Sequence, residues 1–139
     1  MKAHDQDSSE IVLQGQTHWR VYYEDTDFSG YVYHANYLKY FERGREELLG
    51  VERLQEFYRQ GLHFVVAKLQ VSFHRPARHS DLIEVRTVMK ISQSPVVPCE
   101  QSAWLGDEKL VSATLKLAAV DSRGLPTRIG SHVLDILRC

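Results

Sequence analysis

Two aspartates, a glycine and a histidine stand close together in the segment EDTDFSGYVYHAN at positions 24–36. Asp25 and Asp27 can each attack a carbonyl group or activate water, and Gly30 lets the backbone bend or approach a ligand closely. The helical pattern starts near His34, and the first N–H groups of a helix have no acceptor within it. Such groups stabilise negative charge. An acid opposite a helix N-terminus therefore predicts acyl transfer, in which the carboxylate acts on a carbonyl carbon while the N–H groups hold its oxygen.

The same residues also fit other kinds of site. An Asp-x-Asp pair before a helix is typical of helix capping and turn formation. Asp25, Asp27 and His34 could ligate a divalent ion, but the chain has no H-E-x-x-H segment and no paired C-x-x-C segments. Ser29 lies outside any G-x-S-x-G elbow, and Cys99 has no histidine close to it in the sequence. We therefore expect no metal, no cofactor, and no serine or cysteine nucleophile.

The flanking residues predict the elements that position this segment. Apolar residues alternate with polar ones over 17–24, which indicates a strand, and recur every three or four residues over 35–59, which indicates a long helix with a break near Gly50. Gly44 lies on the apolar face of that helix and predicts a close approach to a sheet. The two prolines of 93–99 predict an edge, a bulge or a loop. Further strands are expected at 62–73, 81–91, 99–105 and 109–120.

The order of these elements indicates an α+β domain, with one long helix packed against an antiparallel five-stranded sheet. We expect this domain over residues 17–139, preceded by a flexible extension over 1–16. A short helix that starts at Ser131 and buries its apolar side chains is expected near the C-terminus. One helix covers only part of such a sheet, so a homodimer or homotetramer is expected to cover more of it.

Composition and charge define the broad class. The chain has 139 residues, a net charge of -1 and a sequence pI near 6.6, which give no indication of a nucleic-acid partner. No apolar run reaches the roughly 20 residues of a membrane span, and the polar start MKAHDQDSSE does not resemble a signal peptide. Cys99 and Cys139 are the two cysteines, so a disulfide framework is not expected. These features predict a cytoplasmic protein.

The segment from Asp25 to Glu42 reads D-x-D-x-x-G-x-V-Y-H-A-N-Y-L-x-Y-F-E. It resembles the acyl-coenzyme A (acyl-CoA) thioesterases of the hotdog superfamily, above all the tol–pal-associated branch related to the 4-hydroxybenzoyl-CoA thioesterases. The resemblance extends over about residues 17–128 and includes the later segment VVAKLQVSFHRPARHSDLIEVRT. It implies a hotdog fold, in which a five-stranded antiparallel sheet wraps around one long helix.

The resemblance also implies roles for individual residues. Asp27 matches the family's catalytic carboxylate, and the peptide N–H near His34 matches the group that polarises the thioester carbonyl. Tyr23, Tyr33 and the His34 ring would flank the acyl pocket. Gly30, through its permissive backbone, is a further candidate for contact with the substrate.

Coenzyme A would sit across a dimer interface, with its phosphates near basic surface residues. The candidates for these phosphate contacts are Arg75, Arg78 and Lys90. Glu42 is interpreted as an ion-pair partner of Lys39 and Arg45 rather than as a catalyst.

The predicted function is hydrolysis of an acyl-CoA thioester to a free acid and CoA, with Asp27 as nucleophile or general base. Two alternatives stay open. One is a hotdog protein that binds acyl-CoA without turnover, and the other is a thioesterase that acts on acyl carrier protein. The residues do not predict which acyl group is bound.

Overall fold

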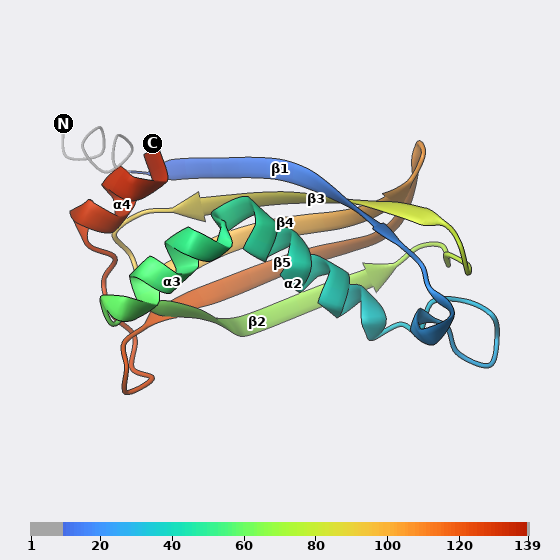
Figure 1. Ribbon diagram of the computed structural model, residues 1–139, viewed down its shortest axis with the longest axis horizontal. Helices are drawn as coiled ribbons and strands as arrows, with labels where there is room; N and C mark the ends of the chain where they lie inside the picture. The colour runs from blue at the N-terminus through green and yellow to red at the C-terminus, as the bar shows by residue number, and fades with distance from the viewer. Residues whose placement is uncertain (1–9, 139) are drawn as a thin grey trace.

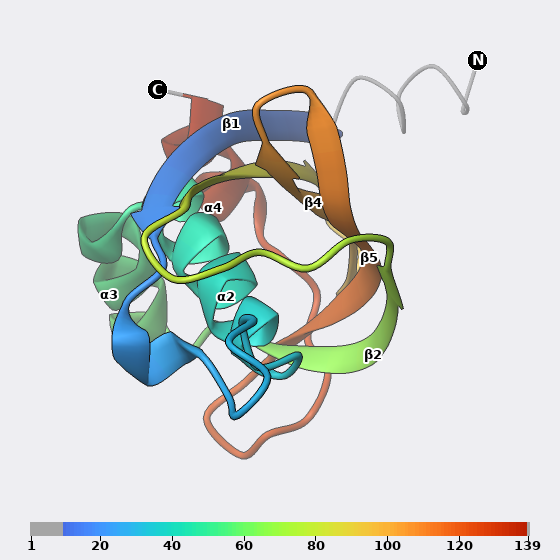
Figure 2. The same cartoon turned by 90° about the vertical axis from the view of Figure 1, so that its right-hand side faces the viewer.

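The computed structural model describes residues 10–138, so residues 1–9 of the expected extension and Cys139 lie outside the described part. Five strands form one antiparallel sheet in the order β1-β3-β4-β5-β2. The sheet curves around the helix α2 (Asn36–Leu49) (Figure 1, Figure 2). This is the α+β hotdog arrangement that the resemblance implies. The strands are β1 (Ile11–Arg20), β2 (His63–Phe73), β3 (Leu82–Ile91), β4 (Val96–Leu105) and β5 (Glu108–Val120).

The first strand begins and ends earlier than predicted. β1 covers Ile11–Arg20 and pairs along its whole length with β3. Residues 11–16 are therefore part of the sheet rather than of a flexible extension. Val21 still exchanges backbone hydrogen bonds with Ser80 and Asp81, directly before β3, and the chain turns away from the sheet after it. A short 3-10 helix, η1 (Tyr23–Asp25), follows instead of the predicted end of the strand.

The long helix divides at the predicted glycine. α2 ends at Leu49, Gly50 adopts a φ of 92°, and α3 (Val51–Arg59) continues from there. Glycine adopts a positive φ without a steric penalty, which fixes the break at this residue. The Arg53 side chain donates from Nε to the Leu49 carbonyl at 2.6 Å and so satisfies one of the carbonyl groups at the end of α2.

The proline-containing segment joins the sheet. β4 begins at Val96, earlier than predicted, and pairs with β5 along its length, with Pro98 opposite Lys116. Its pairing with β3 stops at Cys99. Pro98 therefore stands where β4 has a neighbour on one side only, which is where a residue without an N–H is tolerated. Of the predicted alternatives, a loop is found at residues 93–95 and a local edge at Pro98.

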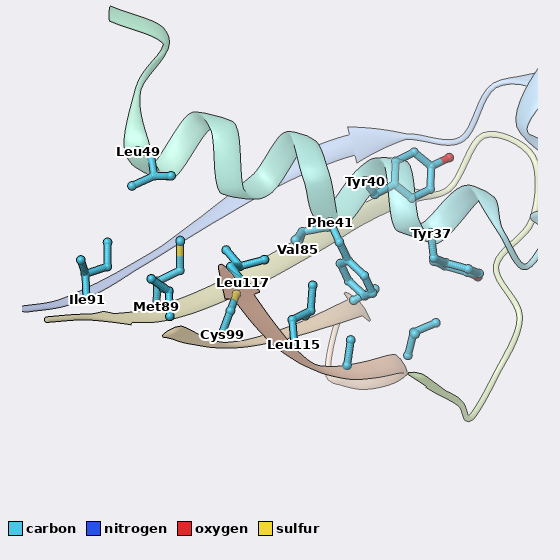
Figure 3. Packing of buried hydrophobic residues seen from close by; sticks show 14 of the residues in the cluster. Tyr37, Tyr40, Phe41, Leu49, Val85, Met89, Ile91, Cys99, Leu115 and Leu117 are labelled. Carbon is cyan, nitrogen blue, oxygen red and sulfur yellow. The ribbon is translucent and has the colours of Figure 1, made fainter. Parts of the chain in front are cut away.

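α2 supplies the centre of the hydrophobic core. Phe41 points into the sheet near Leu115, and Leu49 lies at the other end of the helix, on the side of Ile91 (Figure 3). At Gly44 a Cβ atom would lie 2.9 Å from Val85 Cγ1, so the absence of a side chain lets the helix pack closely on β3. The predicted close approach at this glycine is confirmed.

A buried amide holds the same helix to the sheet. Gln101 is 3% exposed, and its Nε2 donates to the Phe41 carbonyl at 2.8 Å and to Thr87 Oγ1 at 2.9 Å. Arg45 donates from Nη1 to Gln101 Oε1 at 2.9 Å. These bonds join α2 to β3 and to the central strand β4.

The C-terminal segment forms the predicted helix. α4 (Ser131–Arg138) buries Val133, Leu134 and Leu137 and lies beside β1 (Figure 1). No helix within residues 10–138 is long and apolar enough to span a membrane.

Candidate active site

Two turns connect β1 to α2, and Asp27 lies in the second of them. The Gly30 N–H donates to the Asp27 carbonyl at 3.0 Å, and Gly30 has a φ of 84°. Asp27 Oδ1 accepts hydrogen bonds from the Ser29 backbone N–H at 2.8 Å and from the Ser29 hydroxyl at 2.5 Å. The turn thus holds one carboxylate oxygen in place, while Oδ2 has no hydrogen-bond partner within residues 10–138.

The Asp27 side chain is exposed and negatively charged at neutral pH. The Ser29 hydroxyl and the Ser29 N–H lower the pKa of Asp27, slight desolvation opposes them, and the charge of His34 lowers the pKa further. A carboxylate held in this form has electron pairs available for attack on an electrophile.

Asp25, unlike Asp27, is bonded to the helix α2. Its Oδ2 accepts hydrogen bonds from the Tyr22 N–H and from the Tyr40 hydroxyl, both at 2.9 Å. Burial raises the pKa of Asp25, but the bonds from Tyr22, Tyr40 and Asn36, together with the charge of Arg43, lower it by more. Asp25 is therefore a structural acid that ties the first turn to α2.

The start of α2 presents free backbone donors. The Asn36 N–H donates to the Tyr33 carbonyl at 2.8 Å, and the Leu38 N–H donates to the Ala35 carbonyl at 3.1 Å. Within residues 10–138, the N–H groups of His34 and Ala35 have no acceptor. His34 and Ala35 stand directly before α2, with Ala35 as its N-cap residue, so their N–H groups lie at the positive end of the helix dipole, which suits an oxyanion.

Asp27 and His34 line the same cavity, which has a volume of 290 Å³. Its other walls come from the second turn, the first turn of α2, and the end of β2 with the residues that follow it. The His34 ring packs edge-on against Phe73, with ring centroids 6.2 Å apart. The fold thus brings the acid of the turn and the first residues of the helix to one space. The remaining lining residues are Ser29, Tyr31, Val32, Tyr37, Phe73, His74, Arg75 and Pro76.

Of the predicted substrate contacts, Arg75 lines this cavity, and its Nε lies 2.7 Å from Glu108 Oε1. The Tyr33 ring packs against the His34 ring, tilted by 50° with 4.6 Å between centroids, but Tyr33 does not line the cavity itself. Tyr23 is 83% exposed and lies next to His79.

The other predicted contacts lie further out. Gly30 shapes the turn that holds Asp27 without lining the cavity. Arg78 lies over the Tyr31 ring, 5.2 Å from its centroid, and so borders the site. Lys90 is in β3 next to Ile91, which lies at the opposite end of the core from Tyr37 (Figure 3). β3 carries Lys90 away from Arg75 and Arg78 within one chain, so a contact of Lys90 with the CoA phosphates across the expected dimer interface stays a prediction.

The sequence did not single out the wall residues Phe73 and His74. Phe73 is the last residue of β2 and His74 follows it, and a further wall residue, Tyr37, comes from the first turn of α2. The Tyr37 hydroxyl accepts a hydrogen bond from the Ala77 N–H at 3.2 Å, so it ties the helix to the segment after β2. Burial raises the pKa of Tyr37, and the Ala77 bond lowers it by less. The H-R-P run at 74–76 comes directly after a strand-like apolar segment, and it is the sequence feature that could have indicated these wall residues.

Within residues 10–138, no group of three or more histidine, cysteine, aspartate or glutamate side chains is arranged to hold a metal ion.

The geometry can be compared with known proteins. A family model described as the thioesterase-like superfamily matches residues 21–119, which include Asp27, His34 and the cavity walls. The chain belongs to this family. Among relatives of this thioesterase-like chain, "Acyl-CoA thioesterase YbgC" of Haemophilus influenzae is 39% identical over 105 residues, which cover 73% of this chain and 77% of the relative.

A second relative is "Acyl-CoA thioester hydrolase YbgC" of Shigella flexneri, which is 47% identical over 73 residues. That match covers 49% of this chain and 52% of the relative, so the chain spans about half the length of this curated relative. Among solved structures, a probable thioesterase from Bartonella henselae superimposes with a TM-score of 0.77 at 36% identity, over 84% of this chain and 99% of that one. These comparisons confirm the predicted family and the hotdog fold.

Proposed function

We propose that this protein hydrolyses acyl-CoA thioesters to a free acid and CoA. The observation that carries the proposal is the shared cavity, which is lined by the ionised Asp27 and by His34 at the start of α2. The names of the Haemophilus and Shigella relatives support acyl-CoA as the substrate class. Cytoplasmic location, and the choice of CoA over acyl carrier protein, stay predictions.

The chemistry follows from the free carboxylate oxygen and the free helix N–H groups. Asp27 Oδ2 attacks the thioester carbon, the C–S bond breaks, and the thiolate of CoA leaves. Water then hydrolyses the resulting mixed anhydride, which releases the acid and restores Asp27. During both steps the carbonyl oxygen becomes negative, and we assign the N–H groups of His34 and Ala35 to stabilise it.

The second route, in which Asp27 removes a proton from water and the water attacks, uses the same groups. A carboxylate with a lowered pKa is a weak base at neutral pH, so we favour direct attack. In both routes His34 acts mainly through its backbone.

We also propose that two copies of the chain form the working unit through the edge strand β2. Val65, Val66 and Phe73 on this strand are 42%, 47% and 52% exposed, which is unusual for an edge that stays open to water. Phe73 lines the cavity as well, so a second copy at this edge would complete its open side. Arg75 and Arg78 are the proposed contacts for the CoA phosphates from the same subunit.

The test is thiol release from a panel of acyl-CoA esters by the wild type and by Asp27→Asn. Asparagine keeps the shape of the turn but removes the charge, so we expect turnover to fall at least about 100-fold. Asp121→Asn is a matched control, because Asp121 also accepts two backbone N–H bonds in an exposed turn, from Arg123 and Leu125, away from the cavity.

Asp121→Asn should retain wild-type turnover. Full activity in Asp27→Asn would remove Asp27 from the mechanism. Saturable binding of acyl-CoA by the wild type with no thiol release from any ester would instead favour the non-catalytic binding protein.

A further inference from the structure

A second cavity, of 460 Å³, opens between the end of α2, α3 and the first half of β2. Most of its wall is apolar, and Leu54, Phe64, Val66 and Leu117 form much of it. Tyr37, Phe73 and the other walls of the Asp27 cavity take no part in it. It is therefore a separate space at the other end of α2.

One cation, Arg45, lies among these apolar walls. Its side chain crosses from α2 toward β4, where Nη1 donates to Gln101 Oε1 at 2.9 Å. A guanidinium has five N–H donors, and within residues 10–138 the Arg45 side chain makes no other hydrogen bond and has no acid within 4.0 Å. The predicted ion pair between Glu42 and Arg45 is therefore not formed, and the predicted pair between Glu42 and Lys39 is absent from the described residues as well.

The surroundings do not neutralise this cation. Burial lowers the pKa of Arg45, and the opposing effects of Cys99, which acts only when its thiol is ionised, and of Glu42 are smaller. Burial raises the pKa of the Cys99 thiol to about 11, so the thiol is uncharged at neutral pH. Glu42 and Glu46 line the cavity and are exposed, so water screens them, and Tyr58 and His63 complete the set of titratable groups that line it.

The Arg45 guanidinium is half-buried and has unused N–H donors, so an anion with acceptor oxygens would stabilise it. A carboxylate is suited to this, because its two oxygens accept two parallel N–H bonds from the planar guanidinium. The apolar walls would take up a hydrocarbon chain or ring attached to that carboxylate. We propose that the cavity binds an apolar carboxylic acid, with the carboxylate on Arg45 and the hydrocarbon against α3 and β2.

Two kinds of molecule carry both a carboxylate and an apolar chain or ring. One is a free acid such as the product of the proposed hydrolysis. The other is an acyl group that carries a second carboxylate at its far end. The second source depends on the proposed function, whereas binding of a free acid does not.

The decisive experiment is calorimetric titration of the full-length protein with octanoate and with octanol, which share a chain and differ in the carboxylate. The wild type should bind octanoate at least about tenfold more tightly than octanol, which corresponds to about 1.4 kcal/mol. Arg45→Met keeps the length and apolar character of the side chain and should abolish this preference. Arg45→Lys keeps the charge and should retain part of it.

Arg43→Met is the matched control, because Arg43 is on the same helix but lies over the Trp19 ring and does not line this cavity. It should bind octanoate as the wild type does. Equal affinity of the wild type for octanoate and octanol would overturn the proposal. An unchanged octanoate preference in a folded Arg45→Met variant, or in Arg45→Lys and Arg45→Met alike, would also overturn it.

A kinetic arm separates the two sources. Thiol release from a carboxyl-ended acyl-CoA is compared with release from the methyl-ended ester of equal length, in the wild type and in Arg45→Met. A preference for the carboxyl-ended ester that disappears in Arg45→Met assigns the cavity to the substrate's acyl group. Equal rates, with octanoate binding that still depends on Arg45, assign it to a free acid. Since calorimetry needs no turnover, loss of the proposed hydrolase activity would not affect the binding result.

Discussion

His34 contributes two separate groups to the proposed site: a backbone N–H without an acceptor and a ring that packs between Tyr33 and Phe73. The two can be told apart by a substitution that keeps the backbone. His34→Ala leaves the N–H in place and removes the ring and its charge near Asp27. We expect thiol release to fall by less than about tenfold, compared with the loss of about 100-fold or more in Asp27→Asn.

Steady-state assay of both variants with one ester measures this difference. A loss in His34→Ala as large as that in Asp27→Asn would show that the imidazole itself takes part in the chemistry. Tyr33→Phe serves as the control, because it keeps the stacked ring beside position 34.

Asp25 gives the protein a pH-dependent contribution to stability. Its pKa is lower in the folded chain than its ordinary value of 3.8, so the folded state favours the ionised form. The stabilisation is complete above the ordinary value and is lost as the pH falls through the lower folded value. Asp25→Asn should lower the free energy of unfolding at pH 7 by about 1 kcal/mol, because the bonds from Tyr22 and Tyr40 lose their charged acceptor.

Urea denaturation of the wild type and Asp25→Asn between pH 7 and pH 2 checks this sign. The difference in unfolding free energy between the two should be constant down to about pH 5 and should shrink below about pH 4. A difference that widened in acid would contradict the assigned hydrogen bonds.

At the scale of the elements, α2 is the part of the structure that locates the site, and Gly44 sets its distance from β3. Alanine is the better helix former by about 1 kcal/mol. Its Cβ would meet Val85 Cγ1 at 2.9 Å and Thr87 Oγ1 at 3.2 Å, which forces the helix away from the strand. Gly44→Ala should therefore destabilise the protein by a net value of about 1 kcal/mol or more.

Chemical denaturation of Gly44→Ala beside Lys39→Ala measures this effect. Lys39 is exposed on the same helix, so its replacement should change the free energy of unfolding by less than about 0.5 kcal/mol. A stabilised Gly44→Ala variant would mean that the helix can move away from β3 at little cost.

Much of this architecture could be predicted from periodicity, because buried faces repeat every two residues in strands and about every 3.6 residues in helices. The break at Gly50 and the strands β2, β3 and β5 were predicted in this way. The start of β1 was not, since residues 11–16 are mostly exposed and carry a weak pattern. The entry of Pro98 into β4 depends on which side of the strand has a neighbour, and only the order of the strands reveals that.

The residues of the candidate site could likewise be predicted only where they are close together in the sequence. The resemblance assigned Asp27 and His34, which are close in the sequence, and the structure places both in one cavity. Phe73 is the last residue of β2 and His74 follows it, and this strand ends beside the turn only because β2 runs antiparallel to β5. Lys90 and Arg78 are near each other in the chain, but the length of β3 separates them. Contacts between distant segments depend on topology, which a local pattern does not contain.

For the whole molecule, the two edge strands of the sheet lead to different expectations. β2 is an edge whose end lines the Asp27 cavity, and Val66 on this strand is 47% exposed. β1 is the other edge, and Val12 on it is 52% exposed. If the second copy pairs through β2, Val66→Lys should convert the dimer to a monomer and reduce thiol release as well, because a charge on the edge opposes pairing.

Sedimentation velocity of Val66→Lys and Val12→Lys separates the two edges, and Val12→Lys should stay a dimer with wild-type turnover. A wild type that sediments as a monomer, or a Val12→Lys variant that alone dissociates, would rule out the β2 interface.

The contact at Gly44 also has a consequence for the Asp27 cavity, although Gly44 itself does not line it. A side chain at position 44 would push α2 away from β3, because Val85 Cγ1 and Thr87 Oγ1 already lie where its Cβ would stand. Tyr37, the residue that α2 contributes to the cavity wall, would move with the helix. If the cavity binds the acyl group as proposed, we expect variation in its shape to arise in the turn around Asp27 and in the residues after β2, and not at position 44.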